Sequence, residues 1–203
     1  MKALRKWVVI LGYTVLAMTV VSPTAFSSSS ASSARAFVQS IAQTAFGVMH
    51  KADREEADRE FAQGFYMPGF AKRCLVDHWD EITKEQQAEF IEVFTCTLRK
   101  KLASVITDRL KDKRFTYSIG KARRAKGGIV TVTLHAKING ANIDFVYFIV
   151  KLGKSYMLVD YEADGALLSR QYQGHFNFLM DKYGFDGMLD RMRKKFVECN
   201  IGS

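Results

Sequence analysis

The feature that most constrains the fold is a change in the spacing of apolar residues along the chain. Between residues 35 and 110, apolar side chains recur mostly every three or four positions, which is the period of a helix face. Residues 129–137 alternate between apolar and polar types, and residues 143–151 are rich in β-branched and aromatic types, as strands are. Helical spacing returns after residue 167. The chain therefore predicts an α+β domain in which helices from both ends of the sequence pack on one sheet.

The central block predicts a curved sheet of about four antiparallel strands. Strands are expected over residues 115–119, 129–137, 143–151 and 156–161. Gly127-Gly128 and Asn139-Gly140 fall between strands, and the Asn-Gly pair is typical of a two-residue hairpin turn. Short connections of this kind join antiparallel neighbours.

Local signals mark where the helices begin and end. Helices are expected over residues 35–49, 61–79, 84–110, 167–183 and 185–196. Thr83 and Gln86 have the spacing of a capping box, which predicts the start of the long helix over residues 84–110. Pro68-Gly69 interrupts the helical spacing before it, and Gly184 separates the last two helices.

The first residues have the order of a secretory signal peptide. Three basic residues lie within the first six positions, residues 7–22 form an uncharged and mostly apolar run, and small residues follow. We expect residues 1–27 to be removed, residues 28–34 to be a Ser-rich flexible leader, and residues 35–203 to form one domain. The alternative is an uncleaved anchor, but this run is shorter than the roughly 20 residues that span a membrane.

Three cysteines, Cys74, Cys96 and Cys199, bear on the redox compartment. Their odd number leaves at least one thiol unpaired after export to an oxidising compartment. Cys74 and Cys96 fall on predicted neighbouring helices, so they either pair or remain small buried apolar residues, which is the interpretation we favour. There is no CxxC motif to indicate redox chemistry or zinc.

Motifs for catalysis, metals or cofactors are missing from the sequence. The four histidines are not spaced as metal ligands, and there is no GxSxG, P-loop or strand-linked GxGxxG. Asp160, Glu162 and Asp164 alternate at a strand end, which places their side chains on one face of the sheet. Such carboxylates could do acid–base chemistry, but a solvated edge is the interpretation we favour. We therefore predict a protein that is not an enzyme and needs neither metal nor cofactor.

Two basic clusters are candidate docking surfaces. The chain has a formal net charge of +9, although three of its basic residues lie in the segment expected to be removed. Lys121, Arg123 and Arg124 lie near a predicted hairpin loop, and Arg191 and Lys194 lie on the last helix. Neither cluster has the interleaved aromatic residues that single-stranded nucleic-acid binding uses, so we expect contacts with lipid headgroups or membrane proteins instead of nucleic acid.

Two stretches carry a resemblance to a known family. The first runs from Phe65-Tyr66-Met67-Pro68-Gly69-Phe70-Ala71 through Leu75, Trp79, Thr83, Glu85-Gln86 and Phe90. The second runs from Val159-Asp160-Tyr161 through Asp164-Gly165, Leu168, Tyr172 and Phe176 to Gly184-Phe185-Asp186-Gly187-Met188-Leu189. In order and spacing these residues resemble the MlaC family, also called the toluene-tolerance family, over nearly the whole predicted domain.

The resemblance implies a periplasmic carrier that shuttles phospholipid and helps maintain outer-membrane lipid asymmetry. Its expected partners are an inner-membrane MCE/ABC transporter complex and an outer-membrane lipoprotein complex. The acyl tails would lie in an apolar cavity between sheet and helices. The candidate lining residues are Phe94, Leu98, Leu102, Val132, Leu134, Phe145, Tyr147, Ile149, Tyr172 and Phe176.

Two other functions stay open on the sequence alone. A domain of this class could be a ketosteroid-isomerase-like enzyme, which would need Asp144, Asp160 or Glu162 to face the cavity with a raised pKa. It could also be a periplasmic interaction protein whose interior is filled by its own side chains. Phospholipid bound to the purified protein would separate the carrier from both alternatives.

Overall fold

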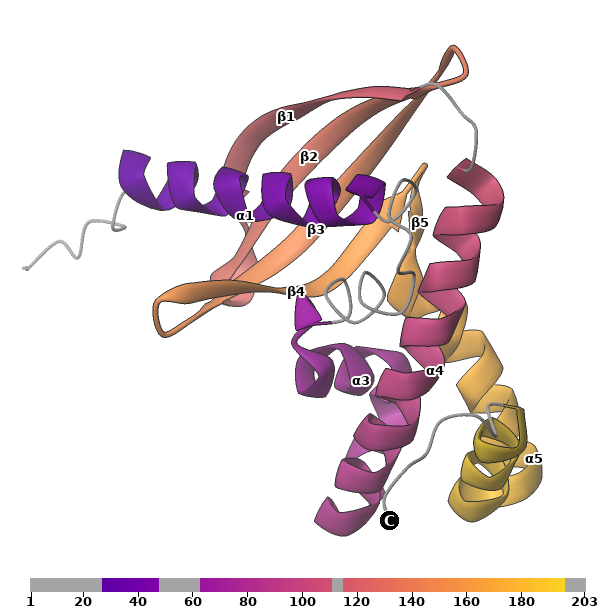
Figure 1. Ribbon diagram of the computed structural model, residues 1–203. Helices are drawn as coiled ribbons and strands as arrows, with labels where there is room; N and C mark the ends of the chain where they lie inside the picture. Colours follow the sequence, from indigo (N-terminus) through magenta and orange to yellow (C-terminus); the bar gives the residue numbers. More distant parts are fainter. Residues whose placement is uncertain (1–26, 48–62, 111–114, 196–203) are drawn as a thin grey trace, which may run out of the picture.

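The computed structural model describes residues 27–47, 63–110 and 115–195 (Figure 1). Its helices are α1 (Ser28–Gly47), α3 (Met67–Leu75), α4 (Lys84–Leu110) and α5 (Leu168–Lys195), with short 3-10 helices η1 (Val76–Asp80) and η2 (Lys126–Gly128). Its strands are β1 (Phe115–Arg124), β2 (Ile129–Ile138), β3 (Ala141–Leu152), β4 (Ser155–Ala163) and β5 (Ala166–Leu167). The prediction of an α+β domain is confirmed.

The strands form one antiparallel sheet in the order β1-β2-β3-β4-β5, and the sheet curves without closing (Figure 1). About four strands were predicted, and the structure adds β5. This strand has only two residues, which is too short to show an alternating pattern. The predicted tight hairpin is present, with Ile138 paired to Ala141 and positive φ angles at both Asn139 and Gly140.

Helix boundaries follow the local signals closely. The Thr83 hydroxyl accepts a hydrogen bond from the Gln86 backbone N–H at 3.2 Å, and the Gln86 side chain accepts one from the Thr83 N–H at 3.0 Å, so the capping box forms. Pro68 lies in the first turn of α3, where its missing N–H is not needed. Residues 28–34, which were predicted to be a flexible leader, instead form the first turns of α1, and Ala34 is buried.

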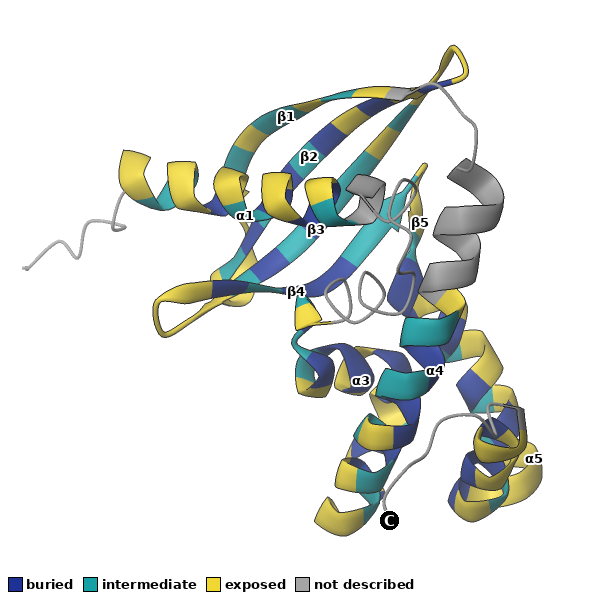
Figure 2. Cartoon of the chain, in the orientation of Figure 1, coloured by how far each residue is buried: buried dark blue, intermediate teal, exposed yellow. Residues whose placement is uncertain are grey.

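The helices lie in two separate places on the sheet. α1 lies across one face, which we call the inner face, and its buried residues Ala34, Val38 and Ile41 belong to the core (Figure 2). Tyr156 on β4 donates a hydrogen bond to the Ser30 carbonyl of α1 at 3.2 Å. Helices α3, α4 and α5 pack together beside β4, and we call them the helical lobe.

The chain just before α3 joins the sheet to the helical lobe. Phe65 makes a parallel bridge to Leu158, with the Tyr66 N–H donating to the Leu158 carbonyl at 2.8 Å and the Leu158 N–H donating to the Gly64 carbonyl at 2.7 Å. This segment therefore pairs with the edge of β4 that β3 does not use. Its hydrogen bonds hold the start of α3 against the sheet.

Candidate functional site

The inner face of the sheet is apolar because alternate residues of the central strands point toward α1. On β2, the side chains of Val130, Val132 and Leu134 are buried, while the residues between them are more exposed. Their β3 partners across the sheet are Ile149, Tyr147 and Phe145. Alternation gives β3 two apolar faces, one with Phe145, Tyr147 and Ile149 and one with Val146, Phe148 and Val150. The face with Phe145, Tyr147 and Ile149 is the one that packs into the core.

Part of the inner face is incompletely covered. The larger apolar side chains of the sheet that pack against the core but keep part of their surface accessible are Tyr117, Ile119, Ile143, Phe145 and Tyr161. Register connects them across the strands, since Ile119 is opposite Leu134, Leu134 is opposite Phe145, and Tyr147 is opposite Tyr161. We call these five residues the inner strip. They offer accessible apolar surface from β1 to β4.

A cluster of aromatic rings fills the helical lobe. Phe94 on α4 lies 5.5 Å from Phe70 on α3, 4.9 Å from Tyr172 and 5.2 Å from Phe176 on α5, measured between ring centroids. Phe90 adds a further ring 5.3 Å from both Phe94 and Phe176. Stacked and edge-to-face contacts at these distances fix the rings relative to one another. The cluster holds three helices together.

The predicted pocket residues therefore fall into two groups. Val132, Leu134, Phe145, Tyr147 and Ile149 lie on the inner face, and Phe94, Tyr172 and Phe176 lie in the aromatic cluster. Leu98 is fully buried one turn further along α4 than Phe94. The Leu102 side chain lies outside the described residues. Tyr161 also lies on the inner face but was not among the predicted lining residues, although its place in the alternation of β4 could have identified it.

Tyrosines connect the two groups. The Tyr147 and Tyr161 rings are 6.3 Å apart on the inner face. Burial raises the pKa of Tyr147 and Tyr172, and the nearby phenol of Tyr161 contributes to both shifts. Among the described residues, the buried Tyr172 hydroxyl finds no hydrogen-bond partner. The junction between sheet and helical lobe therefore carries buried phenol groups.

Asp160 is the buried carboxylate of the sheet, and both of its oxygens accept hydrogen bonds. One oxygen accepts hydrogen bonds from the backbone N–H groups of Tyr161 at 2.9 Å and Ser169 at 3.2 Å, and the other accepts from the Ser169 hydroxyl at 2.6 Å. Burial raises its pKa, although the bonds from Ser169 and Tyr161 act against that shift. Because Ser169 lies in the first turn of α5, this carboxylate ties β4 to the start of that helix.

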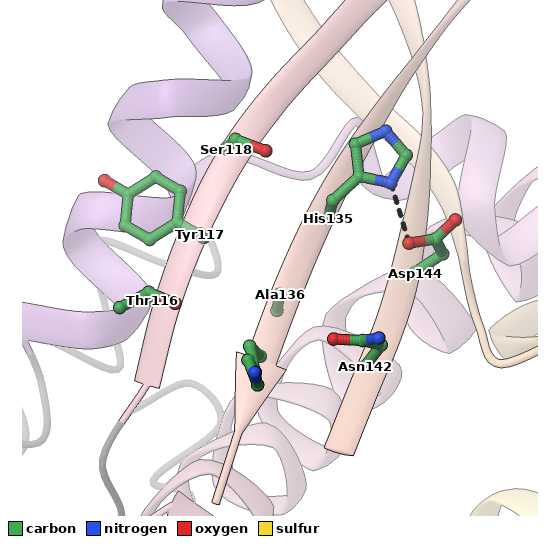
Figure 3. A pocket seen from close by; sticks show the side chains of 8 residues that line it. Thr116, Tyr117, Ser118, His135, Ala136, Asn142 and Asp144 are labelled. Carbon is green, nitrogen blue, oxygen red and sulfur yellow. Dashed lines mark hydrogen bonds and ion pairs between the residues drawn. The ribbon is translucent and has the colours of Figure 1, made fainter. Parts of the chain in front are cut away.

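A polar hollow lies on the opposite face of the sheet, which we call the outer face. Its volume is ≈ 470 Å³, and its lining includes Thr116, Ser118, His135, Asn142 and Asp144 (Figure 3). His135 and Asp144 on neighbouring strands are joined by a hydrogen bond, with 2.8 Å between Nδ1 and Oδ1. Both side chains are about half exposed, so the pair is a solvated cross-strand contact. Asp144 therefore points away from the inner strip.

The two predicted docking clusters lie at different ends of the molecule. Lys121, Arg123 and Arg124 are exposed near the end of β1, whereas Arg191 and Lys194 are exposed in the last turns of α5 (Figure 1). The Arg191 guanidinium carbon is 3.5 Å from the centroid of the Tyr183 ring. Arg193 beside it forms an ion pair with Glu89 on α4.

Cys74 matches the favoured interpretation, and Cys96 does not. Cys74 is a free thiol, fully buried, with a pKa raised by burial. Cys96 is disulfide-bonded, so it neither pairs with Cys74 nor remains a free buried residue, and the favoured interpretation is wrong for Cys96. Its side chain is less buried than that of Cys74, which leaves the sulfur accessible for bonding.

Within residues 27–47, 63–110 and 115–195, no group of three or more His, Cys, Asp or Glu side chains is placed to hold a metal ion. Over the same ranges, no helix combines the length and apolar character that crossing a bilayer requires.

The fold and site define a class of small α+β domains with a curved open sheet, an apolar inner face and a helical lobe. A family model for the MlaC protein matches residues 32–194, and the chain belongs to the MlaC family. A search of curated proteins gave no match.

A solved structure shares this fold. It is a phospholipid-binding protein from Ralstonia solanacearum in complex with a phospholipid, with a TM-score of 0.67 and 17% sequence identity. The similarity covers 81% of this chain and 97% of that one. The shared architecture confirms the predicted fold class, and the family model confirms the predicted family.

Proposed function

We propose that this protein is a periplasmic phospholipid carrier that holds acyl tails against the inner face of its sheet. The observation that carries the proposal is the inner strip, where apolar side chains such as Ile143, Phe145 and Tyr161 remain partly accessible inside the fold. Family membership and the phospholipid in the Ralstonia relative support the same ligand. The aliphatic side chains and aromatic rings of the strip match hydrocarbon.

The free energy of transfer explains why such a ligand needs a carrier. Each buried methylene contributes about 0.8 kcal/mol, so a tail of roughly 16 carbons contributes about 13 kcal/mol. Two tails would contribute about 26 kcal/mol, more than the affinity ceiling near 20 kcal/mol. A lipid leaves a bilayer slowly on its own, and a pocket that matches its tails holds it tightly. Release therefore needs a partner that deforms the pocket.

The proposed partners are complexes of the two membranes. We infer that an inner-membrane MCE/ABC transporter complex and an outer-membrane lipoprotein complex load and unload the carrier. Arg191 and Lys194 at the end of the helical lobe are candidates for contact with such a partner, because both are exposed on one helix. Export through the N-terminal signal peptide would place the chain between the membranes.

Native mass spectrometry of the mature protein, purified without detergent, tests the proposal. Wild-type protein is expected to carry a stoichiometric phospholipid adduct, identified by lipid extraction. Phe145→Trp adds volume to the inner strip and should lower the lipid load several-fold. Phe148→Trp is the matched control, since Phe148 lies on the same strand but faces outward, and it should keep the load.

Two outcomes would contradict the carrier. A lipid-free mass with no uptake from liposomes would exclude tail binding. Equal loss of lipid in the Phe145→Trp and Phe148→Trp variants would show that the inner strip is not the binding surface.

A further inference from the structure

One end of the sheet concentrates positive charge. The β1–β2 and β3–β4 connections lie side by side there, because Arg124 pairs with Val130, Ile129 pairs with Val150, and Leu152 pairs with Ser155 (Figure 1). The connections and adjoining strand ends carry Lys121, Arg123, Arg124, Lys126, Lys151 and Lys154, all exposed, which we call the basic end. No Asp or Glu occurs in residues 119–132 or 148–159.

Nothing on the adjoining helix neutralises this charge. The start of α1 reaches the basic end through the bond from Tyr156 to the Ser30 carbonyl, and α1 contains no acidic residue over Ser28–Gly47. The described acidic side chains lie elsewhere. In the helical lobe and η1 they include Asp77, Glu85, Glu89, Asp181, Asp186 and Asp190. Along residues 119–132 and 148–159 the charges are therefore all positive, whereas the helical lobe carries both signs, with Lys84 and Arg170 among its exposed cations.

Apolar surface adjoins the same cations. Leu152 is 38% exposed at the β3–β4 hairpin, between Lys151 and Lys154. On the outer face behind it, Phe148, Val150 and Met157 are only partly buried (Figure 2). Cations that flank an exposed leucine match the interface of a bilayer, where headgroups are charged and the layer beneath them is apolar.

We propose that the basic end docks the protein on bilayers that contain anionic phospholipids. The lysines and Arg123 would lie among the headgroups, and Leu152 would enter the interfacial layer. An acidic protein would match the charge, but the exposed apolar side chains beside it favour a lipid surface. This docking goes beyond tail binding and does not require that the interior holds lipid, so the two proposals can fail separately.

Vesicle co-sedimentation of the mature protein tests the docking. Wild type should bind vesicles of phosphatidylcholine with 30% phosphatidylglycerol, fail to bind pure phosphatidylcholine, and bind less as salt rises. Each Lys or Arg near an anionic surface contributes about a five-fold factor. Lys151→Gln with Lys154→Gln should therefore weaken binding about 25-fold. Leu152→Ser should weaken it further.

The matched control removes the same charge from the helical lobe. Lys84→Gln with Arg170→Gln changes two exposed cations there and should leave vesicle binding within about two-fold of wild type. Equal weakening by both pairs would show that only net charge matters and would overturn the proposal. Unchanged binding after the changes at the basic end would also overturn it, and so would a wild type that captures acidic proteins but no vesicles.

Discussion

At the scale of single residues, Asp160 combines deep burial with a complete set of hydrogen bonds. Its carboxylate accepts three bonds from Tyr161 and Ser169, yet burial still raises its pKa above the ordinary value. A raised pKa in the folded state means that the native protein binds this proton more strongly than the unfolded chain does. The contribution of Asp160 to stability is therefore present at low pH and is lost as pH rises.

The pH dependence of unfolding checks this prediction. Urea unfolding of wild type and Asp160→Asn should show the variant gaining stability relative to wild type as pH rises above about 3.9, the unfolded value for Asp. Ser169→Ala removes a hydroxyl whose hydrogen bond lowers the pKa of Asp160. In the Ser169→Ala background, the pH range over which Asp160 loses its stabilising contribution should therefore extend to higher pH. A difference that is constant from pH 3 to 7 would contradict a raised pKa.

At the scale of elements, α5 is interrupted by a single residue. Gly184 has φ 66° and ψ −179°, a conformation that residues with a Cβ rarely adopt, and it separates the helical stretch with the aromatic cluster from the one with Arg191. Gly174 lies in the same element without a positive φ, and a Cβ added there would meet no atom within 4 Å. The two glycines therefore predict opposite effects.

Alanine at each position tests that difference. Gly184→Ala should lower the free energy of unfolding by about 1–3 kcal/mol, because the backbone must be strained or rearranged. Gly174→Ala should raise it by about 0.5–1 kcal/mol, because alanine favours the helix. Thermal and urea unfolding measure both. Similar destabilisation by the two changes would mean that helix packing, and not the backbone of Gly184, sets the response.

Elements were predictable where local chemistry decides them. The Thr83 cap, the Asn139-Gly140 turn and the Gly184 break all depend on neighbouring residues, and all three are present. The candidate site was harder to predict from the sequence, because alternation identifies two faces of β3 without showing which one meets a helix. Separating Phe94 and Phe176 from the sheet residues required the packing of three helices, which sequence spacing does not encode.

At the scale of the whole molecule, a ligand that binds only the folded state stabilises it. If phospholipid occupies the interior, protein stripped of lipid should unfold at a lower temperature than loaded protein. Lipid at 100 times its dissociation constant raises the free energy of unfolding by about 2.7 kcal/mol. Calorimetry of matched loaded and stripped samples measures the shift. The same melting temperature in both samples would contradict an interior site.

The bulge in β1 bears on how the chain avoids self-association. On the described chain, β1 has β2 on one side and no strand on the other. The edge of β1 away from β2 could therefore pair with a strand of another copy of the protein. The register shifts between Ile119 and Ala122, Lys121 lies within that shift, and Arg35 donates a hydrogen bond to the Ile119 carbonyl at 3.2 Å. An irregular, charged and partly occupied edge is a poor template for a growing fibril. The protein can therefore keep an open sheet without becoming prone to aggregation.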